Sequence, residues 1–147
     1  MPFYIAYRGD AGGASADYNE LRSQESMISI IVPCYNEQEA LPFFHEEVSR
    51  VLKEIGEDYE LLFVNDGSKD DTLKELKALS TKDPHVIYLS FSRNFGKEAA
   101  MYAGFCNAKG DYIAVMDADL QDPPALLPEM LKMLETDEYD SVATRRV

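Results

Sequence analysis

Short apolar runs alternate with segments of helical periodicity along most of this chain, and that alternation limits the folds open to it. The apolar runs are rich in β-branched and aromatic side chains, as buried strands are, and lie at 28–32, 59–64, 86–91, 112–116 and 141–144. Apolar residues at helical spacing, or small residues, occupy 41–55, 73–79, 97–108 and 123–134. Such alternation is typical of a mostly parallel sheet with helices on both faces. The sequence therefore predicts an α/β fold, a Rossmann-like sandwich.

Residues 1–26 differ from the remainder of the chain. They are mostly small and polar and follow no period, so we expect a loose leader or a non-native extension, with Met27 as the natural start. Residues 27–147 carry the alternating pattern and form the predicted domain. The pattern stops just after its fifth strand, so we expect a C-terminally truncated sheet whose open edge favours association into a homo-oligomer.

Charge and cysteine content exclude several classes of partner. The net charge of −13 does not suit direct binding of nucleic acid or of an anionic membrane surface. Cys34 and Cys106 provide neither a disulfide framework nor the spacing of a thiolate metal site. We therefore expect a reducing, cytoplasmic environment for this chain. No apolar run in the sequence reaches the length of a membrane span. His45 and His85 are isolated in the sequence, and we assign them no role in a site.

Four predicted strands end in polar clusters, at 35–37, 65–68, 92–97 and 117–119. Because the carboxyl ends of parallel strands meet at one edge of a sheet, we expect these clusters to surround one pocket. In the last cluster, Asp117 and Asp119 follow an apolar run and precede two prolines. Paired carboxylates suit Mg²⁺ or Mn²⁺, which takes its other ligands from water and a substrate phosphate. The alternative is an acidic turn that only caps the next helix.

The other clusters contain residues whose roles stay open at this point. Asp66 either accepts hydrogen bonds from a base or sugar, or belongs only to a tight Asn-Asp-Gly turn. Tyr35 is either a stacking surface or a packed aromatic residue, and Glu37 either orients a ligand or is an acid that starts a helix. Lys97 is either a phosphate ligand at a helix N-terminus or a solvated lysine. Arg145 and Arg146 either contact a phosphate from the fifth predicted strand or belong to a frayed terminus.

Four motifs in this order resemble glycosyltransferase family 2: I-I-V-P-C-Y-N-E at 30–37, V-N-D-G-S at 64–68, S-R-N-F-G-K-E-A-A at 92–100 and M-D-A-D-L-Q-D-P-P at 116–124. The resemblance covers 27–147 and is strongest to the polyprenyl-phosphate glycosyltransferases, the branch of dolichyl-phosphate mannose synthase and the bactoprenol glucosyltransferases. It implies a GT-A fold and inverting transfer of a sugar from a nucleotide diphosphate sugar, which we expect to be UDP-linked.

The resemblance also implies roles for individual residues. The family's nucleotide-base positions are matched by Pro33, Tyr35 and Glu37, and its acid that contacts uracil or ribose is matched by Asp66. The catalytic and metal positions are matched by Asp117 and Asp119, with Gln121 as a further metal position. The predicted nucleotide-sugar site also includes Lys97, Ala118 and Arg146, with Arg145 as the neighbouring alternative to Arg146.

The implied chemistry agrees with the charge of these residues. Breaking the sugar–phosphate bond leaves charge on a nucleoside diphosphate, which a metal ion held by Asp117 and Asp119 stabilises. The implied acceptor is a polyprenyl phosphate or another cell-envelope molecule, and a lipid phosphate is largely ionised at neutral pH and needs no strong base. The family continues beyond the fifth strand with acceptor-site elements and, in this branch, membrane helices. We therefore expect donor binding with little or no transfer from this chain, and a membrane-associated full-length protein with a cytoplasmic catalytic domain.

Two alternatives remain. A metal-dependent phosphotransfer enzyme of the haloacid type also places Asp-x-Asp at a strand end, although there the motif normally opens the sheet, whereas here it follows the fourth predicted strand. A non-catalytic nucleotide-binding module would use the same pocket without turnover.

Overall fold

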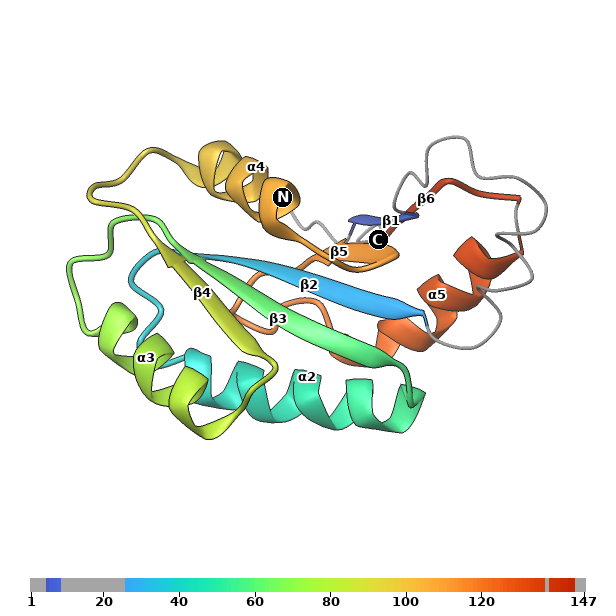
Figure 1. The fold of residues 1–147 in the computed structure, drawn as a ribbon, viewed down its shortest axis with the longest axis horizontal. Coiled ribbons are helices and arrows are strands. Elements are labelled where there is room, and N and C mark those ends of the chain that lie inside the picture. The colour runs from blue at the N-terminus through green and yellow to red at the C-terminus, as the bar shows by residue number, and fades with distance from the viewer. Residues whose placement is uncertain (1–4, 9–25, 137, 145–147) are drawn as a thin grey trace.

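A mixed sheet forms the centre of the molecule in the computed structural model, which describes residues 5–8, 26–136 and 138–144 (Figure 1). Within these residues the strand order is β4-β3-β2-β5-β1-β6. The parallel strands are β2 (Met27–Cys34), β3 (Asp58–Asn65), β4 (Val86–Ser90) and β5 (Tyr112–Val115). Two antiparallel strands, β1 (Ile5–Arg8) and β6 (Ser141–Ala143), extend the sheet beyond β5. The predicted mostly parallel α/β sandwich is confirmed.

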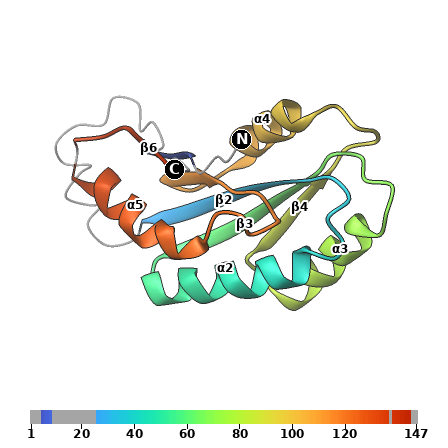
Figure 2. The ribbon, with the colours of Figure 1, turned by 180° about the vertical axis from the view of Figure 1, so that it is seen from behind.

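Helices cover both faces of this sheet, as Figures 1 and 2 show. One face carries α2 (Leu41–Ile55), α3 (Thr72–Lys82) and α5 (Leu127–Glu135), whose buried side chains join one hydrophobic cluster with the strands. The opposite face carries α4 (Lys97–Asn107). A short 3₁₀ turn, η1 (Pro124–Leu126), leads into α5. Within the described ranges, no helix combines the length and apolar content that crossing a membrane requires.

The alternation of side chains along β2 explains why both faces need a cover. Ile30 and Val32 belong to the cluster that includes Phe44 of α2, while Ile31 points to the other face, beneath Gly104 of α4. A Cβ added at Gly104 would collide with the Ile31 side chain. The absence of a side chain at Gly104 therefore lets α4 lie close to the sheet.

One strand lies within the segment for which the sequence predicted a loose leader. Residues Ile5–Arg8 form β1, which pairs antiparallel with β5 in the register Ile5 opposite Val115 and Arg8 opposite Tyr112. Residues 1–4 and 9–25 of that segment lie outside the described part of the chain. A four-residue strand that pairs with residues more than a hundred positions away has too little local pattern to be recognised in a sequence.

An acid-sensitive cluster holds the far end of the sheet, away from the polar strand ends. The Asp83 carboxylate lies 2.7 Å from His45 Nε2 and 2.7 Å from His85 Nδ1, and the His85 ring stacks on Tyr59 with centroids 4.0 Å apart. Partial burial raises the pKa of Asp83, but hydrogen bonds from His45 and His85 outweigh it and lower this pKa to about 2. The two histidines, isolated in the sequence, are thus joined through one carboxylate.

We predict that Asp83 contributes to stability above its unfolded pKa and loses that contribution in acid. Because the folded-state pKa is lowered from 3.8 to about 2, the contribution is full above about pH 4 and disappears as pH falls from about 4 to about 2. Asp83→Asn should lower the free energy of unfolding by about 1–2 kcal/mol at pH 7 and leave little difference from wild type near pH 2. Urea denaturation at a series of pH values measures this; an equal difference at pH 7 and pH 2 would contradict it.

Candidate functional site

A pocket of about 260 Å³ opens at the carboxyl edge of the parallel strands. Its lining comes from the ends of β2, β3 and β5 and the start of α4, and consists of Pro33, Cys34, Tyr35, Glu37, Asp66, Lys97, Asp117 and Asp119. Seven of these eight residues belong to the site predicted from sequence, and Cys34 is the addition. Residues spread over more than eighty positions therefore surround one hollow, as the parallel topology requires.

Hydrogen bonds between side chains and backbone join the loops after β2 and β3. Asn36 N donates to Ser68 Oγ at 3.0 Å, and Lys69 N donates to Asn36 Oδ1 at 2.8 Å. Glu37 N donates to Thr72 Oγ1 at 2.9 Å. Asn36 has a φ of 53°, a left-handed conformation that asparagine tolerates better than most residues. The position of Glu37 is thus fixed by contacts with residues more than thirty positions away.

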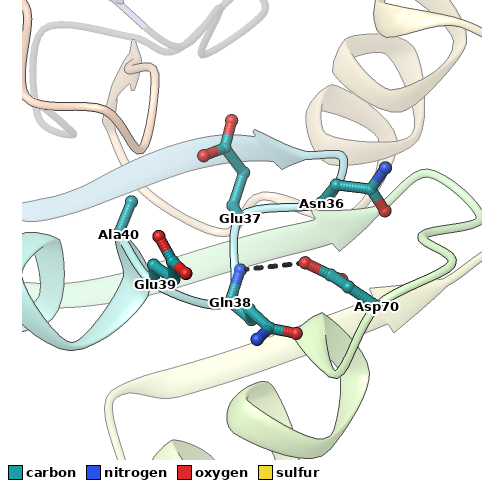
Figure 3. A pocket seen from close by; sticks show the side chains of 6 residues that line it. All are labelled: Asn36, Glu37, Gln38, Glu39, Ala40 and Asp70. Atoms are coloured by element: carbon teal, nitrogen blue, oxygen red, sulfur yellow. Dashed lines mark hydrogen bonds between the residues drawn. The ribbon is translucent and has the colours of Figure 1, made fainter.

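A second hollow of about 430 Å³ lies at the loop after β2 (Figure 3) and is lined by Asn36, Glu37, Gln38, Glu39, Ala40 and Asp70. Gln38 N donates to Asp70 Oδ2 at 3.4 Å between two residues of this lining. Glu37 lines both hollows, and in Figure 3 its carboxylate points away from Asp70. The two hollows therefore share Glu37, and Glu39 and Asp70 make the lining of the larger one acidic as well.

Asp66 is buried at the end of β3, and its carboxylate is hydrogen-bonded to the loop that precedes α4. Its carboxylate accepts hydrogen bonds from Phe95 N at 2.7 Å, Gly96 N at 3.0 Å and Asn94 Nδ2 at 3.1 Å, and only 4% of its surface is exposed. For this residue the resemblance to the family predicts a contact with the base or ribose. In the structure Asp66 also has a structural role, because its hydrogen bonds hold the loop that precedes Lys97.

The loop after β5 carries the two acids predicted to bind a metal. Asp117 is half-buried and Asp119 is exposed, and Asp119 Oδ1 accepts a hydrogen bond from Gln121 N at 3.2 Å. Leu120, which lies between Asp119 and Gln121, has a φ of 56°, which is uncommon for a residue other than glycine. Its side chain packs against the hydrophobic cluster. The backbone strain is thus held by core packing directly beside the acids.

The remaining predicted residues are placed less directly. Ala118 is 1% exposed and belongs to the hydrophobic cluster, so its methyl group packs into the core and any ligand contact would come from its backbone. Gln121 is exposed beside Asp119 and is absent from the eight lining residues. Arg145 and Arg146 lie outside the described residues.

The pocket carries an excess of negative charge that alters the chemistry of its lining. Burial raises the pKa of Glu37, and the carboxylates of Asp119, Asp117 and Asp70 raise it further, while Lys97 lowers it. Burial also raises the pKa of the Cys34 thiol, with Glu37 and Asp117 adding to the effect. Cys34 donates to Val32 O at 3.4 Å. A protonated, buried thiol of this kind is no nucleophile.

The donor chemistry of this lining fits a hard divalent cation that a ligand helps to hold. Within the described residues, no group of three or more His, Cys, Asp or Glu side chains is arranged to hold a metal ion by itself. Asp117 and Asp119 nevertheless offer two carboxylates on the same pocket. Mg²⁺ and Mn²⁺ sites with one or two carboxylates, completed by water and substrate phosphate, are common.

Sequence reasoning missed the residues that fix the loops, chiefly Asn36, Thr72 and Asn94. Each acts through a hydrogen bond to a residue 28 to 35 positions away, so the motifs that contain Asn36 and Asn94 do not reveal these partners. The one available signal was the density of Asn, Ser, Thr and Asp at the strand ends, since these side chains bond readily to backbone groups.

Comparison with known sequences gives a family match over most of the chain. Residues 29–147 match the family model described as glycosyl transferase family 2. CsbB of Bacillus subtilis is 49% identical over 123 residues, which cover 84% of this chain and 37% of that protein. The undecaprenyl-phosphate 4-deoxy-4-formamido-L-arabinose transferase of Proteus mirabilis is 42% identical over 120 residues, covering 81% and 36%. The prophage bactoprenol glucosyl transferase homolog of Escherichia coli is 46% identical over 105 residues, covering 71% and 34%. The chain spans about a third of the length of these relatives.

Solved structures match the fold. A mannosyltransferase from Pyrobaculum calidifontis in complex with GDP-Man and Mn²⁺ has a TM-score of 0.64 at 21% identity, covering 76% of this chain and 33% of that one. Glucosyl-3-phosphoglycerate synthase from Mycobacterium tuberculosis, in complex with Mn²⁺, UDP-glucose and phosphoglyceric acid, has a TM-score of 0.61 at 22% identity, covering 88% and 46%. At these identities the likeness concerns the fold, and it is the GT-A type of α/β sandwich that the sequence predicted.

Proposed function

The chain belongs to glycosyltransferase family 2, and from this premise we propose that its pocket binds a nucleotide diphosphate sugar together with Mg²⁺ or Mn²⁺. We propose UDP as the nucleotide. The observation that carries the proposal is the pocket itself, where Tyr35, Glu37, Asp66, Lys97 and the two aspartates of the β5 loop line one hollow. The half-exposed ring of Tyr35 in this lining suits a stacked base, and Asp117 and Asp119 suit a metal-bound diphosphate.

Charge explains why the diphosphate needs a cation here. Four of the eight lining residues are acidic and one, Lys97, is basic, so a free diphosphate would meet net repulsion. Asp117 and Asp119 would hold the metal ion, which when bound neutralises charge on the phosphates and on the leaving nucleoside diphosphate. Lys97 lies in the first turn of α4, where an ammonium group and the positive end of a helix both favour phosphate oxygens. Tyr35 and Glu37 would orient the nucleotide.

The proposed reaction of the longer protein is inverting transfer of the sugar to a polyprenyl phosphate at the membrane. The support comes from relatives named as bactoprenol glucosyl transferase and undecaprenyl-phosphate arabinose-derivative transferase. Those names carry different sugars, so the proposal concerns the lipid phosphate acceptor and not one sugar. A lipid phosphate brings its own negative oxygen as nucleophile, which fits a pocket whose buried thiol is protonated.

The proposal predicts metal-dependent binding of UDP by this chain. Titration calorimetry should show heat with UDP in the presence of Mn²⁺, and at least about tenfold weaker binding when the metal is removed with a chelator. UMP is the matched control, because it keeps the base and ribose but lacks the second phosphate that would bridge to the metal. Absence of heat from UDP with or without Mn²⁺ would overturn the donor-site proposal for this chain.

A further inference from the structure

An ion pair spans the pocket between the start of α4 and the loop after β5. Lys97 Nζ lies 2.6 Å from Asp117 Oδ1, and both side chains reach solvent, at 48% and 29% of their surface. Lys97 is the basic member of a lining that also holds Glu37, Asp66 and Asp119. The ammonium therefore sits against an oxygen that a divalent cation would use as a ligand.

Asp66 fixes the backbone of the two residues that precede Lys97. The Asp66 carboxylate receives the N–H groups of Phe95 and Gly96, and Lys97 follows immediately as the first residue of α4. Gly96 has a φ of 103°, which directs the chain from this loop into the helix. The backbone at Lys97 is thus held in place, while its four-carbon side chain keeps the freedom to exchange partners.

We propose that Lys97 is a built-in cation of the unloaded pocket, which occupies Asp117 until a metal-bound diphosphate replaces it. The inference rests on the proposed donor site. An exposed ion pair is weak, so a doubly charged ion is able to displace the ammonium, but a metal ion that arrives alone must compete with it. A diphosphate that arrives with the metal offers the released ammonium new partners. Lys97 would thereby disfavour metal alone and favour metal with nucleotide, which couples the two ligands.

This role gives effects of opposite sign on two ligands. Lys97→Met should bind Mn²⁺ alone about fivefold more tightly than wild type, because a competing exposed ion pair is removed. The same variant should bind UDP in saturating Mn²⁺ about fivefold to tenfold more weakly, because a phosphate contact is lost. The ratio of Mn²⁺ affinities with and without UDP should fall at least about fivefold. If Lys97 merely supported the fold, its substitution would weaken the binding of both Mn²⁺ and UDP.

The experiment compares wild type, Lys97→Met and Lys97→Arg, with Lys77→Met as a charge-matched control on the exposed side of α3. Paramagnetic resonance of free Mn²⁺ gives metal affinity with and without UDP, calorimetry gives UDP affinity in Mn²⁺, and circular dichroism verifies folding. Lys97→Arg and Lys77→Met should retain wild-type Mn²⁺ affinity. If wild type binds UDP with Mn²⁺ but Lys97→Met does not gain affinity for Mn²⁺ alone, the inference is overturned and the donor site stands. If wild type binds neither Mn²⁺ nor UDP, both fall.

Discussion

Replacing Gly67 by alanine is expected to lower the free energy of unfolding by about 3 kcal/mol and to weaken UDP binding. Gly67 has a φ of +64°, and an added Cβ would clash with backbone atoms of Arg93 and Asn94. The left-handed conformation alone costs an alanine about 1 kcal/mol, and forced displacement of packed neighbours adds about 1–3 kcal/mol. The neighbour here is backbone, so relief requires movement of the loop that Asp66 holds. Urea denaturation measures the stability, and hydrogen exchange of the Phe95 and Gly96 amides measures the loop.

Gly56 provides the matched control for this substitution. It ends α2 with a φ of +82°, and a Cβ there would meet nothing within 4 Å. Gly56→Ala should therefore cost only the conformational strain of about 1 kcal/mol and leave UDP binding unchanged. The difference between the two variants isolates the close approach of the β3 and β4 loops. Equal losses of stability in the two variants would show that Gly67 is needed for its conformation and not for the contact with Arg93 and Asn94.

The sequence was sufficient to predict the four parallel strands, the helices and the edge at which the pocket lies, but not β1. Each parallel strand is a short apolar run that ends at a proline or a polar cluster, and this signal is local. Strand order is not local: the insertion of β1 between β5 and β6 depends on pairing across more than a hundred residues. The sequence also could not show that Ala118 packs its methyl group into the core, since its neighbours Asp117 and Asp119 are both polar.

The partners of the site residues were the harder part to predict. An Asn-Asp-Gly segment is compatible with a turn or with a ligand contact, and the amides that occupy Asp66 lie about thirty positions away. Likewise Lys97 and Asp117 each looked like a residue that faces a ligand, and nothing in their separate motifs indicated that they pair at 2.6 Å. Patterns identify which residues reach a pocket, whereas hydrogen bonds across the fold decide what those residues do before a ligand arrives.

Asp119→Asn is expected to reduce Mn²⁺-dependent UDP binding by about 100-fold. Loss of groups that only orient metal ligands typically costs 10–100-fold in affinity, so loss of a direct ligand should reach at least about the upper end. The substitution is structurally mild, because Asp119 is exposed and asparagine keeps an oxygen at Oδ1 to accept the hydrogen bond from Gln121 N. Calorimetry with UDP in Mn²⁺ and after chelation measures the effect, and the residual affinity without metal should be no weaker than that of wild type, because one repelling carboxylate is removed.

Two further variants show whether this loss reflects a ligand or only charge. Asp71→Asn removes one negative charge from an exposed position near the same edge of the sheet but outside both hollows, and should change UDP binding by less than about twofold. Asp117→Asn should lose metal-dependent binding as Asp119→Asn does, and it also frees Lys97 from its ion pair. Since the released ammonium is then available to phosphate, UDP without metal should bind more tightly to Asp117→Asn than to Asp119→Asn. Unchanged metal dependence in Asp119→Asn would remove this residue from the metal site.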